Sequence, residues 1–444
     1  MKQTFHITTF GCQMNEHDSE TIAGMLSGLD YTPSASRNDA DVIIINTCSV
    51  RENADHRFFG TLGQLKRIRK ERPDLIVAVC GCMMQQQHVI DKLKSQYPWV
   101  DLIFGTHTIH RFPELLQNVR QERVKLVDVM EDSEEIVEGL PVRRNHPNKA
   151  YVNIMYGCNN FCTYCIVPYT RGRERSRDTE EILREVKELV KDGVKEITLL
   201  GQNVNSYRGT GRQGQRIEFA DLITELDRIH GLSRIRFMTS HPKDLSDALI
   251  LAYRNCPSLC PHIHLPVQSG STSVLERMNR KYNREDYIAL VERLRSVCPD
   301  IAITTDIIVG FPGETEEEFQ DTLRLVEEIE FDSAFTFLYS IRKGTPAETF
   351  EDQVPEEIKH ERFNRLVETV NRISAKKNAT KVGCVEDVLV EGASKSNDRV
   401  YTGRTGGFKL VNFKGPEGSK GTVVSVRITD SNTFSLTGVV ECDE

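Results

Sequence analysis

The feature that most constrains this chain is a repeated alternation between short β-rich runs and segments of helical periodicity. In the first part of the chain, the β-rich runs are Thr4–Phe10, Val42–Asn46, Leu75–Val79 and 100–104. Helical patterns lie between and after them, at about 19–29, 56–72 and 111–120. Strands and helices in this order form a parallel sheet with right-handed crossovers.

The alternation starts again after the stretch 131–148, which is acidic, then contains two prolines, and is interpreted as a linker. Six further β-rich runs follow, separated by helical segments. They are Tyr151–Met155, Glu196–Leu200, Arg234–Met238, His262–Pro266, Ile301–Val309 and Ser333–Phe337. Six such units predict a partial or complete α/β barrel, whose active site lies at the C-terminal ends of its strands.

The end of the chain has a different pattern. A long helix is predicted over 355–379, and Val-, Thr- and Gly-rich runs then alternate in short segments that indicate a small β-barrel. We therefore expect an α/β protein of four parts. These are an N-terminal parallel α/β domain (1–130), a linker (131–148), a six-unit barrel (149–378) and a C-terminal β-barrel (379–442).

The 444 residues, 39% of them hydrophobic, suffice for several cores. The longest apolar runs, such as Val42–Ile45, are too short to cross a bilayer, and Met1–His6 lacks the apolar core of a signal peptide. We therefore expect a cytoplasmic protein without membrane contact. Its twelve cysteines would stay as free thiols there and serve metal or redox chemistry.

The strongest chemical signal is the spacing Cys158-x3-Cys162-x2-Cys165, which follows the first strand of the predicted six-unit barrel. Three thiolates within eight residues can ligate three irons of a 4Fe–4S cluster. The fourth iron then has no protein ligand and is open to a small molecule. The alternative is a zinc site, but zinc takes four ligands, typically as two pairs, and no second pair lies in range.

A second set of cysteines occurs in the first domain, where Cys12, Cys48 and Cys82 each follow one of the first three strands. The carboxyl ends of parallel strands share one edge of a sheet, so these thiols can converge on a second cluster. The alternative is that each is a small buried residue. The remaining cysteines are interpreted as structural: Cys80, Cys256, Cys260, Cys298, Cys384 and Cys442.

The motif Cys158–Cys165 after the first strand of a six-unit barrel resembles the radical S-adenosylmethionine (SAM) superfamily. The resemblance implies that SAM chelates the open iron. It also implies that one electron from the cluster cleaves SAM to methionine and a 5′-deoxyadenosyl radical. With the second cysteine set and the C-terminal β-barrel, the whole chain is similar to the methylthiotransferase family, whose C-terminal domain is the TRAM RNA-binding module.

Within that family the resemblance is to a branch that modifies tRNA, carried by Thr9–Asn15, Ile166–Glu174, Gly403–Thr405 and Val411–Gly415. It implies a transferase that inserts a methylthio group at carbon 2 of N(6)-(isopentenyl)adenosine at position 37, next to the anticodon. It also implies two 4Fe–4S clusters, the one at Cys12, Cys48 and Cys82 being an auxiliary cluster that carries the sulfur. The resemblance further implies two SAM molecules per turnover, a flavodoxin- or ferredoxin-type electron donor and a sulfur-supply protein.

Other functions stay open on the sequence. The same chemistry could act on a ribosomal-protein aspartate or on threonylcarbamoyladenosine in tRNA. A different class of protein, a non-catalytic Fe–S sensor that binds RNA, is the third alternative. Phe408-Lys409 also departs from the Asn-Arg pair that is common in the family.

Further residues are expected to contact SAM or RNA. The cofactor candidates are polar residues at barrel strand ends, which could instead cap helices: Gln202, Asn203, Ser240, Gln268, Ser269 and Asp306. His241 could be a contact or a structural histidine. The net charge of −8 argues against nucleic acid, yet residues 376–442 carry ten basic and seven acidic side chains. The RNA candidates, which could instead be solvated loop or barrel core, are Arg171, Arg173, Arg175, Arg177, Arg404, Lys409 and Phe413.

Overall fold

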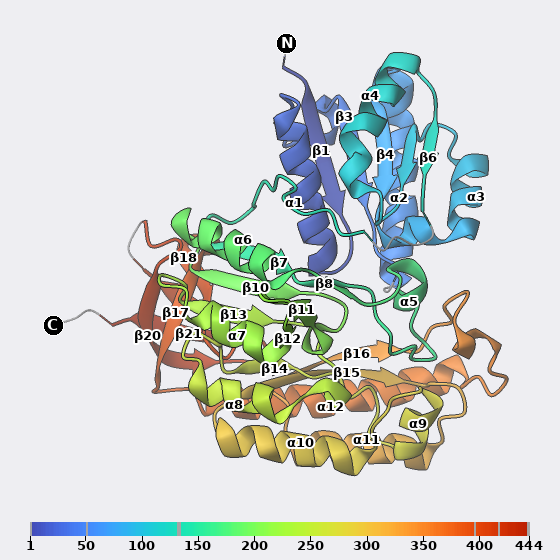
Figure 1. Cartoon of the computed structure of the whole chain (residues 1–444). Coiled ribbons are helices and arrows are strands. Elements are labelled where there is room, and N and C mark those ends of the chain that lie inside the picture. The colour runs from blue at the N-terminus through green and yellow to red at the C-terminus, as the bar shows by residue number, and fades with distance from the viewer. Residues whose placement is uncertain (1, 50–51, 131–134, 395–396, 416–417, 442–444) are drawn as a thin grey trace.

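The N-terminal region is a parallel sheet covered by helices on both faces (Figure 1). The computed structural model describes residues 2–49, 52–130, 135–394, 397–415 and 418–441. The sheet order is β2-β1-β3-β4-β5-β6, from β1 (Thr4–Thr9), β2 (Thr32–Pro33), β3 (Val42–Asn46), β4 (Ile76–Cys80), β5 (Leu102–Phe104) and β6 (Leu126–Asp128). Its helices are α1 (Gln13–Gly28), α2 (Glu52–Glu71), α3 (Gln87–Gln96) and α4 (Phe112–Glu122).

The central strand β3 explains the double coverage. All five of its residues are buried, and they alternate between two hydrophobic clusters, with Val42 and Ile44 in one and Ile43 and Ile45 in the other. A continuous aliphatic strand is typical of a parallel sheet buried on both faces. The predicted strands are confirmed here, and the structure adds β2, β6 and α3.

The central region contains the six predicted strands as two parallel sheets of three. Their orders are β13-β10-β7 and β14-β15-β16. The strands are β7 (Lys149–Asn153), β10 (Glu196–Leu200), β13 (Arg234–Phe237), β14 (His262–His264), β15 (Ala302–Val309) and β16 (Ser333–Leu338). A parallel bridge between Ile235 and Leu259 joins the two sheets at their adjoining edges. The fold is therefore an α/β partial barrel.

Helices cover the outer face of this partial barrel (Figure 1). They are α6 (Thr179–Lys191), α7 (Phe219–Asp227), α8 (Asp247–Asn255), α9 (Thr272–Arg277), α10 (Arg284–Val297), α11 (Glu316–Ile329) and α12 (Glu356–Ala379). Shorter elements complete the region: β8 (Met155–Tyr156), α5 (Val167–Thr170), β9 (Arg175–Ser176), β11 (Arg208–Thr210) and β12 (Arg216–Glu218).

The two faces of the central strands differ in character. On the outer face, Ile197, Ile263 and Ile303 belong to the main hydrophobic core, which packs against the helices. The opposite residues are polar and buried, as shown by Glu196, Arg236 and His264. Because side chains alternate along a strand, a polar inner face and an apolar outer face follow from the sequence pattern.

The C-terminal region is a closed barrel of five strands in the order β17-β18-β19-β21-β20. They are β17 (Val385–Ser394), β18 (Asn397–Arg404), β19 (Leu410–Lys414), β20 (Val423–Ser431) and β21 (Leu436–Val440). The β18–β19 loop reaches the central region, where Arg236 donates to the carbonyls of Thr405 and Gly406 at 2.7 and 2.8 Å. The Phe408 ring stacks on His262 with 5.0 Å between centroids.

In the part of the chain that the structure describes, no helix combines the length and apolarity needed to cross a membrane. Cys442 lies outside the described residues.

Candidate functional site

One loop, between β8 and α5, carries Cys158, Cys162 and Cys165. The amide of Cys165 donates to the carbonyl of Cys162 at 2.9 Å, which closes a turn of the loop. Gly157 begins the loop at φ 77°, where a Cβ would lie 2.0 Å from the carbonyl oxygen of Arg173. Only glycine fits this close approach, so backbone packing requires Gly157, while Cys158 next to it supplies the thiol.

The second cysteine set comes from three separated segments. Cys12 caps the N-terminus of α1, Cys48 follows β3, and Cys82 starts the turn that follows β4. A hydrogen bond links Cys12 to Cys48, and Arg171 acts electrostatically on both Cys12 and Cys82. The structure therefore brings the three thiols together at the carboxyl edge of the sheet.

Two glycines allow this convergence. A Cβ on Gly11 would lie 2.6 Å from the Cβ of Cys48, and one on Gly81 (φ 100°) would lie 2.2 Å from the carbonyl oxygen of Thr47. The backbone segments that carry the three cysteines thus approach more closely than any larger residue permits.

The thiols of the two sets differ in acidity. The hydrogen bond from Cys48 lowers the pKa of Cys12 to about 6, and the Arg171 cation acts in the same direction. Burial instead raises the pKa of Cys158 to about 11, that of Cys165 to about 12, and that of Cys82. Since the thiolate is the ligand, loading of the buried cysteines with iron must release their protons.

Both sets suit a 4Fe–4S cluster. Each supplies three thiols, and each lies beside buried polar atoms that have no hydrogen-bond partner among the described residues. These atoms are Thr47 Oγ1 and Ser49 Oγ on either side of Cys48, and Asn160 Oδ1 in the Cys158 loop. Asn153 Oδ1, at the end of β7, and Asn203 Oδ1, after β10, also have no such partner. Buried polar atoms are normally satisfied, so a water, an ion or another bound group is the expected partner of these atoms.

No group of three or more His, Cys, Asp or Glu side chains within the described ranges is arranged to hold a single metal ion. A cluster does not need such an arrangement, because each thiolate binds its own iron.

One buried arginine donates to a cysteine sulfur at each site. Arg171 Nε lies 3.0 Å from Cys82 Sγ, and its Nη2 lies 2.8 Å from Asp18 Oδ2. Arg280 Nη1 lies 3.4 Å from Cys162 Sγ. Arg280, Asp18 and this role of Arg171 were missed in the sequence, because contacts made across more than 80 residues leave no local spacing.

The expected RNA contacts of Arg171 and Arg177 need correction. Arg171 is only 4% exposed, and Arg177 is buried with its guanidinium between Glu138 and Glu185 at distances of 2.5 and 2.7 Å. Neither can reach a phosphate. Arg173 is exposed over the Phe161 ring, at 4.3 Å, and Arg175 is partly buried.

Two of the three C-terminal candidates, Phe413 and Lys409, need the same correction. Phe413 is 2% exposed and belongs to the core of the small barrel, and Lys409 Nζ pairs with Asp332 at 2.9 Å in the interface with β16. Arg404 lies over Phe408, with 4.3 Å from its guanidinium carbon to the ring centroid. Phe413 and Lys409 therefore have structural roles, whereas Arg404 is partly exposed and its contact with RNA stays a prediction.

Four of the six predicted SAM contacts use their side chains in hydrogen bonds within the protein. The side chains of Ser240 and Ser269 bond to protein, the first to the carbonyl of His264 and the second to Thr322 Oγ1 at 3.3 Å. Gln202 accepts a hydrogen bond from the amide of Gly157, and Asn203 donates to Asp244 at 2.7 Å. Gln268 lies in the segment after β14, and its backbone N–H donates to the carbonyl of Asp306 at 2.9 Å.

His241 has the structural position. It is 5% exposed, accepts from the amide of Lys243 at 3.2 Å, and has a pKa well below its usual range because of burial.

A line of polar side chains crosses the inner face of the partial barrel. Asp306 Oδ2 lies 3.4 Å from His264 Nε2, and Thr304 Oγ1 bridges His264 and His262 at 3.0 and 3.1 Å. Phe335, on the neighbouring strand β16, meets the His264 ring edge-on and is 52% exposed, and Phe337 is 37% exposed. The signal in the sequence is polar residues two apart, at 262 and 264 and at 304 and 306.

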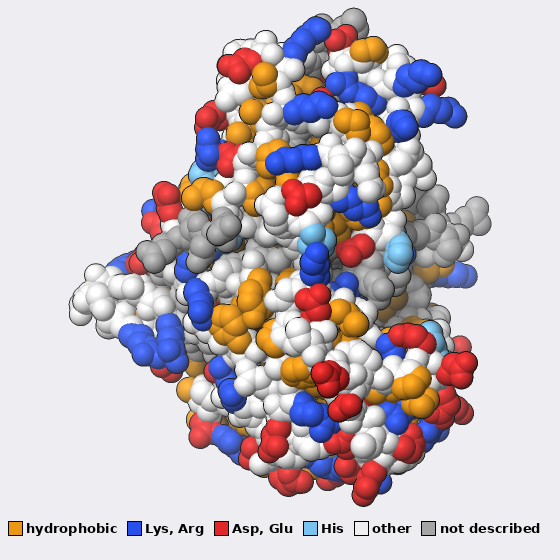
Figure 2. Space-filling view, turned by 90° about the vertical axis from the view of Figure 1, so that its right-hand side faces the viewer, with side chains coloured by type: hydrophobic (Ala, Val, Ile, Leu, Met, Phe, Trp, Pro, Cys, Tyr) orange, Lys and Arg blue, Asp and Glu red, His pale blue; other side chains and the backbone are white. Residues whose placement is uncertain are grey.

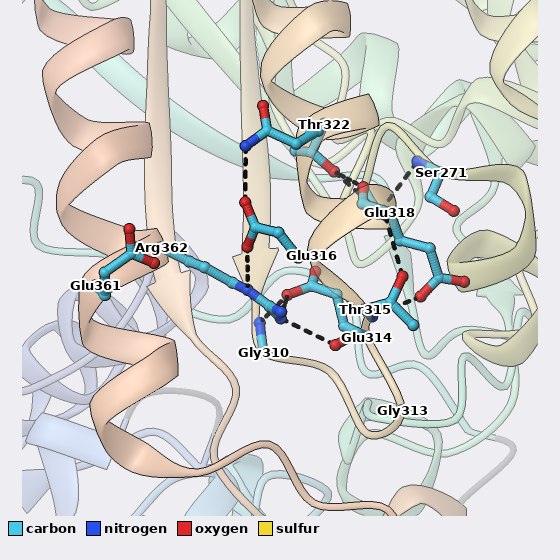
Figure 3. A network of polar contacts seen from close by, with 12 residues as sticks. Ser271, Gly310, Gly313, Glu314, Thr315, Glu316, Glu318, Thr322, Glu361 and Arg362 are labelled. Carbon is cyan, nitrogen blue, oxygen red and sulfur yellow. Dashed lines mark hydrogen bonds and ion pairs between the residues drawn. The ribbon is translucent and has the colours of Figure 1, made fainter.

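A buried network fixes the loop after β15 (Figure 3). Glu314 Oε2 accepts from the amide of Gly310 at 2.9 Å and from Arg362 of α12 at 3.1 Å. Burial raises the pKa of Glu314 to about 7. The network pins α12 to the C-terminal end of the strand that carries Asp306.

Figure 2 shows the face that lies at the right of Figure 1. Lys, Arg and His side chains lie among hydrophobic ones where the N-terminal region, at the top, meets the central region below it. Acidic side chains gather toward the bottom of this face.

Three family descriptions match the chain. Residues 4–105 match "Uncharacterized protein family UPF0004", residues 152–326 match "Radical SAM superfamily", and residues 379–440 match "TRAM domain".

Proteins named tRNA-2-methylthio-N(6)-dimethylallyladenosine synthase are similar over nearly the whole length. That of Clostridium tetani is 56% identical, covering 98% of this chain and 96% of the relative. That of Acetivibrio thermocellus is 56% identical, covering 99% and 91%.

Among solved structures, the radical SAM methyltransferase TsrM from Kitasatospora setae has a TM-score of 0.55 at 13% identity. The similarity covers 78% of this chain and 77% of TsrM. At that identity, the similarity establishes a shared fold.

Proposed function

The chain belongs to the tRNA-2-methylthio-N(6)-dimethylallyladenosine synthases, a family of radical SAM methylthiotransferases, and on that premise we propose how its residues divide the reaction. The substrate is N(6)-(isopentenyl)adenosine at tRNA position 37, and a methylthio group is inserted at carbon 2. The observation that carries the proposal is the presence of two separate cysteine triads, at Cys12/Cys48/Cys82 and at Cys158/Cys162/Cys165.

The two triads would hold two clusters of different purpose. Cys158, Cys162 and Cys165 would hold the cluster that, with SAM, would supply a radical able to activate a C–H bond that no protein base can deprotonate. The auxiliary cluster at Cys12, Cys48 and Cys82 would carry the sulfur, with a second SAM as the methyl source. An electron-donor protein of flavodoxin or ferredoxin type and a sulfur-supply protein complete this proposal.

The protein's own part is to position and enclose these groups. Gly157 and Gln202 hold the cysteine loop, and Asn153, Asn160 and Asn203 offer unpartnered oxygens to SAM. Asn153 and Asn160 extend the set of SAM contacts inferred from sequence, of which Asn203, Asp306 and Gln268 remain in the proposal.

The substrate base would enter over the inner face of β16. Phe335 and Phe337 are exposed aromatic side chains in a region that is otherwise polar, beside the Asp306 carboxylate. Aromatic rings stack on unpaired bases, and their apolar edges suit the isopentenyl group. Arg173 and Arg175 lie beside the cysteine loop and would meet phosphates.

The C-terminal barrel would hold the RNA through an exposed aromatic residue that the sequence analysis did not single out. Phe434, in the β20–β21 loop, is 77% exposed. Its loop is anchored on α12, because Asn378 donates to the carbonyls of Asn432 and Thr433 at 2.8 and 3.1 Å. An exposed aromatic side chain on an anchored loop is a stacking platform.

The test uses anaerobically reconstituted protein with dithionite, SAM and an anticodon stem-loop that contains N(6)-(isopentenyl)adenosine. We expect the 2-methylthio nucleoside by mass spectrometry, and about eight irons per chain, falling to about four in the Cys12→Ala/Cys48→Ala/Cys82→Ala variant. Full iron loading without 5′-deoxyadenosine would instead indicate an RNA-binding sensor. A deletion strain with unchanged methylthio-adenosine in tRNA would exclude the tRNA substrate and direct attention to a ribosomal-protein aspartate.

A further inference from the structure

The two cysteine triads have the same number of thiols and the same kind of partner, a buried arginine that donates to one sulfur. The surroundings of the two arginines differ in charge. Around Arg171 the charge is cancelled, because Asp18 lies 2.8 Å from its guanidinium and both side chains are nearly fully buried, with 5% and 7% exposure.

Around Arg280 the charge is not cancelled. Its guanidinium donates to Tyr282 Oη at 2.9 Å, to the carbonyl of Pro266 at 2.8 Å and to Cys162 Sγ at 3.4 Å. Within the described residues, no Asp or Glu forms an ion pair with it, and the titratable groups that act on it are tyrosines and Cys162. Tyrosine is neutral near pH 7.

The other charges near the Cys158 loop do not change this difference. Arg173 lies over Phe161 of the loop, but it is exposed, so solvent screens its charge. Glu174 and Lys243 both act on Cys158, with opposite sign, so their effects on the loop oppose each other. Arg280 therefore leaves one positive charge, buried at 7% exposure, at this site.

The reduction potential of an iron–sulfur cluster depends on the net charge around it and on hydrogen bonds to its sulfurs. A cluster that gains one electron becomes more negative, so a nearby buried cation stabilises the reduced form. An arginine paired with a carboxylate keeps its hydrogen bond to sulfur but contributes only the weaker field of an ion pair.

We propose that Arg280 raises the reduction potential of the cluster at Cys158, Cys162 and Cys165, whereas Asp18 withholds the corresponding effect of Arg171 from the cluster at Cys12, Cys48 and Cys82. An incoming electron from a flavodoxin- or ferredoxin-type donor would thereby be directed to the cluster that would bind SAM. One electron enters, one cluster is reduced by one unit, and no bond is made or broken in this step. The proposal rests on the proposed function, because it takes both triads to hold 4Fe–4S clusters.

Arg280 and Asp18 are positioning residues on this view, and potentiometric titration followed by electron paramagnetic resonance tests them. The signals are separated in full-length chains that keep one triad, the other being changed to alanine. With only the Cys158 triad present, Arg280→Gln is expected to lower the ratio of reduced to oxidised cluster at a fixed potential at least tenfold, which is 59 mV for one electron. Arg280→Lys keeps the charge and should retain most of the potential.

With only the Cys12 triad present, Asp18→Asn should raise the same ratio by a similar factor, because it exposes the charge of Arg171. Equal shifts in Arg280→Gln and Arg280→Lys would overturn the role of the charge at the SAM site. An unchanged potential in Asp18→Asn, with normal iron content, would overturn the compensation at the auxiliary site. If the wild-type chain binds only four irons, the proposed function fails instead, and the Arg280 pair of variants still decides its own half.

Discussion

The two cysteine sites each bring three thiols together, but by opposite routes. Cys158, Cys162 and Cys165 lie in one loop, so their proximity follows directly from their spacing within eight residues of sequence. Cys12, Cys48 and Cys82 are brought together by three parallel strands and by close backbone approach at Gly11 and Gly81. A site made by local spacing survives changes elsewhere in the domain, whereas a site made by the fold depends on the whole sheet.

The strongest test of this comparison removes one triad at a time. Changing Cys158, Cys162 and Cys165 to alanine should abolish 5′-deoxyadenosine formation, by more than about 1,000-fold, because SAM loses its open iron. Changing Cys12, Cys48 and Cys82 to alanine should keep 5′-deoxyadenosine formation and abolish the methylthio product. Chromatography of both products measures the difference, and loss of 5′-deoxyadenosine in both variants would remove the division of labour.

A second test strains each site through its glycine. Gly81→Ala should place a Cβ against the carbonyl of Thr47 at a positive φ and cost about 2 kcal/mol of folding stability. Iron should fall by about four per chain, with the Cys158 cluster retained. Gly157→Ala should show the reverse loss, since its Cβ would meet the carbonyl of Arg173.

The control for both is Gly63→Ala in α2, where a Cβ meets nothing within 4 Å. It should leave the iron content unchanged and stabilise the helix by about 0.5–1 kcal/mol. Thermal melts with iron analysis give the readout, and equal iron loss in Gly63→Ala would show that the effect is general instability.

A third test concerns substrate placement. Phe335→Ala should weaken the use of the stem-loop RNA by about 5- to 150-fold in kcat/KM, the worth of about 1–3 kcal/mol for stacking on one base. Formation of 5′-deoxyadenosine without RNA should not change. Phe335→Tyr, which keeps the ring, is the matched variant and should retain most of the activity, and an equal loss in both would contradict stacking.

The smallest expected effect is a shift in pH dependence. Because the pKa of Cys12 is lowered to about 6, its thiolate should already predominate at pH 7 in iron-free protein. Alkylation by iodoacetamide should therefore rise through pH 6 and level off by about pH 7.5, while Cys158 and Cys165, with pKa values of about 11 and 12, stay slow. Peptide mass spectrometry locates the label, and a Cys12 rate that still climbs steeply above pH 8 would contradict the lowered pKa.

The sequence was sufficient where the determinant is local or periodic. The apolar run Val42–Asn46 predicted a strand of a parallel sheet, the six β-rich runs predicted a partial or complete barrel, and the long helix at 355–379 is confirmed as α12. The family resemblance and the fold class are also confirmed.

The sequence was misleading where charge alone indicated function. Arg171, Arg177 and Lys409 were expected to meet RNA, but each has a carboxylate partner contributed by a distant segment: Asp18, Glu138 and Asp332. Phe413 follows the inward alternation of β19 and fills the small barrel. A basic or aromatic residue near a site is therefore informative only when the structure shows which side it faces.

The contact between the β18–β19 loop and the partial barrel has a consequence for the geometry of the reaction. Arg234 and Arg236 hold three carbonyls of residues 404–406, and Phe408 lies on His262, so the C-terminal barrel is seated on the central region rather than tethered to it. If that barrel grips the RNA, the separation between the grip and the cysteine loop is a fixed length of the protein. The enzyme would then select its target adenosine by its distance along the RNA from the segment that the barrel binds, in addition to recognising the base itself.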